Sequence, residues 1–219
     1  MAEIDVVRYT KAIQRVLVYI PIVHTETDMG GLSGPVQRAA LRLMGLKAWR
    51  RKSRTVDSIW TEIERAIDRL GLGYERVRLY QDGLAVCGRE IEIVTDLAEK
   101  GSRNHCLLLK LIEKGASLMG TESAELLLEE YEHAKRAAAV QKTGGALRAP
   151  PLESSNGASL LDRRDRFIAA RINGTLCTGE TGVLFLGMLH SLDNLLAEGI
   201  RVVYVPWLPS YRKGGIENE

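Results

Sequence analysis

Two of the four histidines in the chain follow apolar segments that are typical of buried strands. His24 follows RVLVYIPIV at 15–23, and His190 ends TGVLFLGMLH at 181–190. Continuous runs of Val, Ile and Leu indicate strands that are buried on both faces of a parallel sheet. Because parallel strands end at a common edge, where open α/β folds bind their ligands, we expect both histidines at one site.

Acidic side chains follow three of the predicted strands, and we expect them at the same edge. They are Glu26 and Asp28, Asp82, and Glu122. Imidazoles and carboxylates that lie together bind divalent metals or carry out general acid–base chemistry. The ligands that we predict for a divalent metal (zinc, manganese or iron) are His24, Asp28 and His190. The carboxylates that we predict as catalytic groups are Glu26 and Glu122.

Each of these residues also has an ordinary structural explanation. Asp82 stands before Gly83 in a turn dipeptide, so we expect it to serve the turn rather than the site. Glu26 and Asp28 could satisfy turn amides, and Glu122 could interact with the dipole of the next helix.

A helix predicted at 159–176 carries four arginines and leads directly into the strand before His190. An arginine on the inner side of this helix would reach the sheet edge and hold an anionic group through two parallel hydrogen bonds. The alternative for each arginine is an ion pair on the helix surface.

The order of the elements predicts the fold class. Three times a predicted helix ends near a glycine and an extended segment follows, at Gly71, Gly115 and Gly199. Glycine accepts the left-handed conformation that ends helices. Helices that alternate with strands indicate crossover connections and a parallel sheet. We therefore predict one α/β domain over 1–219, with a mostly parallel sheet of about five strands flanked by helices.

The segments between these elements are also assigned from their residues. Paired glycines and prolines at 142–157 predict a long loop, and 207–219 is predicted to be a flexible tail. The basic segment RRKSR at 50–54 is expected to be a solvated loop between two helices. A short helix is expected at 191–198, directly after His190. The glycine-rich turn at 30–34 could cradle a phosphate but matches no phosphate-binding motif.

Composition restricts the class of protein. The net charge is +2 and aromatic residues make up 5%. A near-neutral chain with few stacking platforms disfavours a nucleic-acid partner. Three cysteines without a CxxC pair fit a reducing, cytoplasmic setting, and no apolar segment is long enough to span a membrane.

The C-terminal region resembles a known group of enzymes. The segment RDRFIA at 164–169, then a strand, then Gly187-Met188-Leu189-His190, is similar to the second half of the TraB/TIKI group. This superfamily of metal-dependent hydrolases is related to erythromycin esterase-like and ChaN-like proteins. Its members pair an early and a late Gly-x-x-His motif with acidic residues and an arginine-bearing helix. This chain has Pro21 where the early motif has its glycine.

The resemblance implies a role for individual residues. The late histidine is His190, the early histidine is His24, an acid is Glu122, and the arginine is Arg164 or Arg166. It also implies hydrolysis of a peptide or ester bond by water that a metal activates. We therefore predict a metal-dependent hydrolase acting on a small-molecule or peptide substrate, and a homo-oligomer is possible.

Two other functions fit the same sequence. One is a non-catalytic binder or sensor of a small, nucleotide-like ligand, which would use the glycine-rich turn at 30–34. The other is a nucleic-acid-associated interaction protein, which would use the arginines at 50–54 and 163–171.

Overall fold

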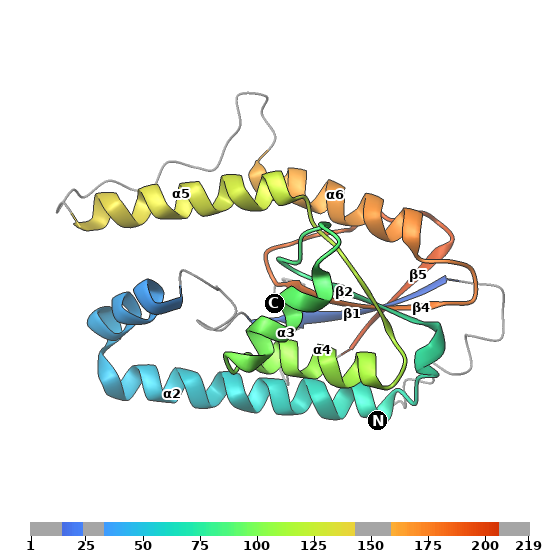
Figure 1. Ribbon diagram of the computed structural model, residues 1–219, viewed down its shortest axis with the longest axis horizontal. Helices are drawn as coiled ribbons and strands as arrows, with labels where there is room; N and C mark the ends of the chain where they lie inside the picture. Colours follow the sequence, from blue (N-terminus) through green and yellow to red (C-terminus); the bar gives the residue numbers. More distant parts are fainter. Residues whose placement is uncertain (1–14, 24–32, 143–158, 206–219) are drawn as a thin grey trace, which may run out of the picture.

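The computed structural model describes residues 15–23, 33–142 and 159–205, and its centre is a parallel sheet. Within these ranges five strands lie in the order β3-β2-β4-β1-β5, and every neighbouring pair is parallel. Their bounds are β1 (Arg15–Ile22), β2 (Val77–Gln81), β3 (Ser117–Met119), β4 (Thr181–Gly187) and β5 (Ile200–Tyr204). The predicted α/β fold with one parallel sheet is confirmed (Figure 1).

Helices cover both faces of this sheet. Their bounds are α2 (Ser33–Arg69), α3 (Glu90–Glu99), α4 (Arg103–Glu113), α5 (Ala124–Lys142) and α6 (Leu160–Thr175), with a short 3₁₀ helix, η2 (Tyr74–Arg76). Figure 1 shows α6 over one face and α2 with α4 over the other. No helix in the described ranges has the length and apolarity needed to cross a membrane.

Alternation along the central strands divides the core into two layers. Successive side chains of a strand point to opposite faces of the sheet. Val18 of β1 therefore lies in the layer that contains Trp60 of α2, whereas Leu17 lies in the layer that contains Ile168 of α6. Since β1 and β4 are central, both of their faces are covered, which explains their nearly continuous apolar sequences.

The strand order creates a crevice at one position of the sheet edge. The chain leaves β2 toward β3 on one side, and it leaves β4 toward β5 on the other side. Connections that diverge from neighbouring strands leave a space beyond their carboxyl ends, where α/β proteins bind ligands. The residues that follow β2 and β4 are therefore the ones placed to form a site.

Two of the expected connecting segments differ from prediction. Residues 50–54 are not a loop, because α2 continues through them and is interrupted only at Gly45, which has φ 74 and ψ 162. Arginine and lysine are good helix formers, and Thr55 donates to the Arg51 carbonyl instead of capping a new helix. Residues 191–198 form turns rather than a helix, and Asn194 there has a φ of 64. The predicted loop at 142–157, apart from Lys142, and the tail at 207–219 lie outside the described residues.

Gly120, directly after β3, lies close to the backbone of the loop that follows β2. A Cβ at this position would lie 2.7 Å from the Val86 Cα and 3.0 Å from the Ala85 carbonyl oxygen. These are backbone atoms, so we expect Gly120→Ala to lower the free energy of unfolding by about 1–3 kcal/mol in urea denaturation. Gly174 in α6 has no atom within 4 Å of its Cβ position. Gly174→Ala is the matched control and should raise stability by about 0.5–1 kcal/mol. Equal effects of the two changes would contradict the close approach.

Candidate functional site

The carboxyl ends of three adjacent strands bring together two acids and a histidine. Asp82 follows β2 directly, Glu122 lies shortly after β3, and His190 lies three residues beyond the end of β4. One ligand atom from each of these side chains lies within 4.8 Å of the others. With Arg164 and Asp165 of α6, these residues form what we call the edge cluster.

Arg164 lies at the centre of the edge cluster. Its Nε donates to Glu122 Oε2 at 2.7 Å. Its Nη2 donates to Glu122 Oε1, and it also donates to Asp82 Oδ1 at 2.8 Å. Its Nη1 donates to Glu130 of α5 at 2.9 Å. The side chains of Arg164, Asp82 and Glu122 are 6%, 4% and 0% exposed. One guanidinium thus connects the ends of β2 and β3 to α5 and α6.

Backbone amides fix both carboxylates in position. The Gly187 N–H, at the end of β4, donates to Asp82 Oδ2 at 2.9 Å. The Gly83 N–H donates to Glu122 Oε1, also at 2.9 Å. The segment that carries Glu122 is itself held by the Leu84 carbonyl, which accepts from the Glu122 N–H at 3.0 Å. The two carboxylates are therefore positioned by the strand ends as well as by Arg164.

His190 is oriented by a carboxylate on α6. Its Nδ1 is 2.5 Å from Asp165 Oδ1, and Asp165 Oδ2 accepts from the Ser191 N–H at 3.0 Å. This places the other ring nitrogen, Nε2, 3.7 Å from Asp82 Oδ2, which is too far for a hydrogen bond. The imidazole is thus held on one side while its second nitrogen faces an acid.

The edge cluster buries more carboxyl groups than permanently charged cations. Asp82, Glu122 and Asp165 are all buried, and Arg164 is the one arginine or lysine that is buried with them among the described residues. Burying an uncompensated carboxylate is costly, so such a group gains a proton or a cation. The edge cluster therefore has the charge as well as the geometry to hold a metal ion.

The titration of Glu122 reflects this imbalance. Burial raises the pKa of the Glu122 carboxyl, and the nearby charge of Asp82 adds to the rise, although the hydrogen bonds and charge of Arg164 oppose it. For Arg164, burial alone lowers the pKa, but Glu122 and Asp82 outweigh it and the pKa rises. The rise for Glu122 disfavours its charged form, whereas the rise for Arg164 favours its charged form. Glu122 is left only partly compensated, because Arg164 is shared among three carboxylates.

The structure brings together only some of the predicted site residues. Glu122, Arg164 and His190 meet in the edge cluster, whereas His24, Glu26 and Asp28 lie outside the described residues. Arg166 does not join, because it lies about 200° around the helix from Arg164 and is exposed.

Asp82 was expected to serve a turn, and Asp165 was not among the predicted site residues. Asp82 does belong to a tight turn, but its side chain points back to the Gly187 amide and to Arg164. Asp165 is adjacent to Arg164 and is buried like it, which the mixed charges at the start of α6 did not indicate. Neither the protein-family models, nor the curated proteins, nor the solved structures that we compared with this chain gave a match.

Replacing Arg164 tests whether the edge cluster depends on one cation. Arg164→Met would leave buried carboxylates unpaired, so we expect it to lower the free energy of unfolding by about 3–5 kcal/mol. The adjacent Arg163 pairs with Glu129 at 2.9 Å, with side chains 36% and 37% exposed. Arg163→Met should cost only about 0–1 kcal/mol, because solvent screens this pair. Urea denaturation of both variants measures the difference, and similar losses would contradict the central role of Arg164.

The raised pKa of Glu122 predicts a pH dependence of stability. A carboxyl whose pKa is higher in the folded than in the unfolded chain stabilises the fold below its ordinary pKa, here 4.5, and this stabilisation is lost as the pH rises through the raised value. The free energy of unfolding of the wild type, relative to Glu122→Gln, should therefore fall as the pH rises above 4.5. Urea denaturation with a chelator present measures it. A relative stability that increases with pH would mean that Arg164 dominates instead.

Proposed function

We propose that this protein is a metal-dependent hydrolase of a peptide or ester bond, with its centre between the ends of β2 and β4. The observation that carries the proposal is the pair His190 Nε2 and Asp82 Oδ2, which face each other across 3.7 Å. A zinc-like ion binds imidazole nitrogen and carboxylate oxygen at about 2.0–2.2 Å, so one ion can contact both atoms at this separation. The two atoms are too far apart for a direct hydrogen bond, which would bring them to about 3 Å.

Asp165 supports the same interpretation. Histidines that bind metals usually donate their other ring N–H to a carboxylate, which fixes the tautomer and the ring orientation. Asp165 contacts Nδ1 of His190 and is itself fixed by the Ser191 amide. This contact orients the ring so that Nε2 is the nitrogen available to an ion.

Glu122 is suited to be the third ligand. Its Oε1 accepts from both Gly83 and Arg164, whereas its Oε2 accepts one hydrogen bond within the described structure, from Arg164 Nε. A carboxylate oxygen has two lone pairs, so Oε2 keeps one for an ion. Three protein ligands with an open fourth position are typical of catalytic zinc sites.

A buried acceptor next to Asp82 also favours a bound species here. The Oε1 of Gln81, which is 1% exposed, has no hydrogen-bond partner within the described residues. Its Nε2 donates to the Asp82 carbonyl at 3.0 Å. Buried polar atoms are rarely left unpaired. A bound water or other ligand at the end of β2 would supply a partner.

The protein groups then have separate roles. When bound, the metal supplies a nucleophile by lowering the pKa of its water. Arg164 orients the substrate through Nη1, whose partner Glu130 is 47% exposed and can be displaced by an incoming oxygen. A carboxylate oxygen of the edge cluster that does not contact the metal takes the proton from the water. The TraB/TIKI resemblance gives the same roles to His190, Glu122 and Arg164, which favours this assignment.

Metal binding is the first test of the proposal. We expect the untagged wild-type protein to bind one equivalent of zinc, manganese or iron in elemental analysis and calorimetry. Asp82→Asn combined with His190→Gln should abolish binding, and Asp165→Asn should weaken it about 10–100-fold. His133→Gln, on α5 outside the edge cluster, is the control and should bind like the wild type. Unchanged binding by the double variant would exclude this site.

Hydrolysis is tested separately from binding. The metal-loaded protein should cleave members of a panel of activated esters and short peptides, and a chelator should abolish the activity. Glu122→Gln should reduce kcat/KM by at least about 100-fold, as expected for loss of a general base or ligand. Metal binding without any cleavage would indicate a binding or sensor protein and would overturn the hydrolase proposal.

A further inference from the structure

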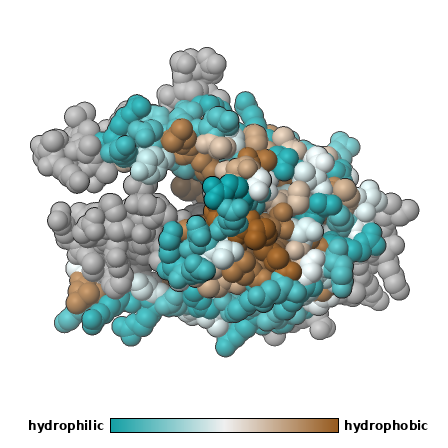
Figure 2. All heavy atoms as spheres, viewed as in Figure 1, coloured by the Kyte–Doolittle hydropathy of each residue, from teal (hydrophilic) through white to brown (hydrophobic). Residues whose placement is uncertain are grey.

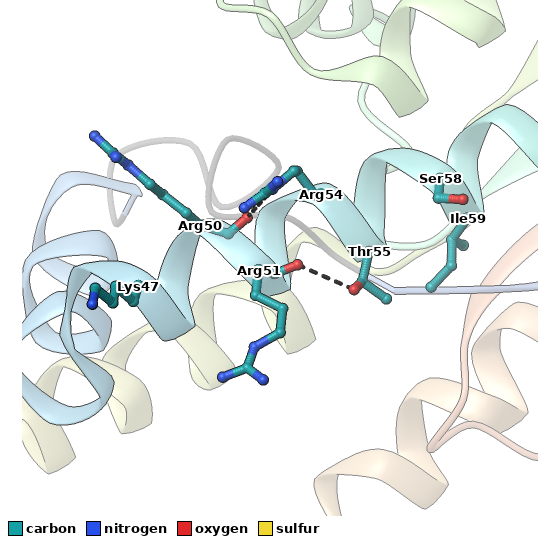
Figure 3. Close-up of a pocket in the computed structure, with 7 residues that line it drawn as sticks. All are labelled: Lys47, Arg50, Arg51, Arg54, Thr55, Ser58 and Ile59. Carbon is teal, nitrogen blue, oxygen red and sulfur yellow. Dashed lines mark hydrogen bonds between the residues drawn. The ribbon is translucent and has the colours of Figure 1, made fainter.

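The middle of α2 carries an exposed group of cations that lies outside the edge cluster. Lys47, Arg50, Arg51 and Arg54, which we call the α2 basic face, line a hollow of about 840 Å³. Thr55, Ser58 and Ile59 complete its lining (Figure 3). All four cations are exposed, so an anion could reach them without unfolding any part of the helix.

The charges of the α2 basic face are not neutralised by neighbours. Within the part of the chain that the structure describes, none of the four cations forms an ion pair. Farther along α2 the charges are matched, since Glu62 pairs with Arg65, Glu64 with Arg103, and Asp68 with Lys114. With a net charge of only +2, the rest of the chain is on balance slightly acidic. The positive charge is thus concentrated on one short helical surface.

The spacing of these cations follows from the helix. Positions 47, 50, 51 and 54 are separated by three or four residues, so they lie along one side of α2. They extend over about 10 Å of helix axis at 1.5 Å per residue. Figure 3 shows Thr55 and Ser58 continuing along the same helix. A row of donors of this length matches a chain of successive phosphates better than a single anion.

We propose that the α2 basic face binds the phosphate backbone of a nucleic acid. Arginine and lysine supply most phosphate contacts, and hydroxyl side chains add to them. No aromatic side chain lines the hollow, so base stacking does not contribute and the binding is independent of sequence. The expectation that 50–54 is a solvated loop, which disfavoured such a partner, is replaced by a rigid helix that fixes the cations in a row.

The structure favours nucleic acid over an anionic membrane. A helix that binds a membrane surface inserts a large apolar face between the lipids. The nearest apolar residues on the opposite side of the following turns of α2, Val56 and Trp60, are already buried in the core. Ile59 is the one apolar residue in the hollow. This inference does not depend on the metal site or on hydrolysis.

The test compares two pairs of arginines on the same helix. The full-length wild type should bind a fluorescent oligonucleotide in anisotropy titrations, with an affinity that falls steeply from about 50 to about 200 mM salt. Arg51→Ala with Arg54→Ala should weaken binding about tenfold or more at the lower salt, and it should reduce the salt slope by about 1.4 for a single strand or about 1.8 for a duplex. Arg65→Ala with Arg69→Ala removes the same charge from exposed positions outside the hollow and should change affinity less than about twofold.

Three results would overturn the proposal. One is no binding of single or double strands by the wild type at the lowest salt. The second is an equal loss in both double variants, which would reflect net charge alone. The third is tighter binding to vesicles of anionic lipid than to either oligonucleotide, lost in the same variant. The replaced side chains are all exposed, so unchanged melting temperatures should confirm that each variant is folded.

Discussion

The edge of the sheet depends on a single buried guanidinium. Without Arg164, the carboxylates that end β2 and β3 would repel each other in a space that water scarcely reaches. The requirement to pair this guanidinium fixes α6 over the end of the sheet, because Arg164 and Asp165 must both face inward. It also draws in α5 through Glu130. Helix placement and site geometry therefore have the same cause.

One cation is nevertheless too few for the acids around it. A purely structural ion pair would be expected to balance, since replacing buried charges with apolar groups is often neutral or stabilising. Here a third acid, Asp165, contacts a histidine and orients its ring instead of pairing with Arg164. Buried groups with perturbed pKa values in a crevice are characteristic of functional sites. The excess of buried acids is consistent with the proposal that the site binds a cation.

The fold could be predicted from the sequence because its signals are local and repeated. Apolar strands, such as the segment at 181–190, alternate with helices that end at glycine, and this leaves few topologies. The site could be predicted only in part. The position of His190 after a strand indicated the correct edge, but Asp82 in Asp82-Gly83 was taken for turn chemistry. A turn residue and a site residue have the same local sequence, and only the register of β2 beside β4 distinguishes them. The prediction of a loop at 50–54 was wrong for a similar reason, since a run of basic residues is compatible with loop and helix alike.

The net charge does not describe how charge is distributed over the molecule. Figure 2 shows hydrophilic side chains around an apolar area at the centre of this face. The near-neutral total conceals a separation, with acids buried at the strand ends and cations exposed on α2. Electrostatic fields act over about 10 Å at moderate salt, so each region presents its own charge to a ligand. An average over 219 residues cannot report such a separation, whereas the placement of a few side chains on one strand edge and one helix can.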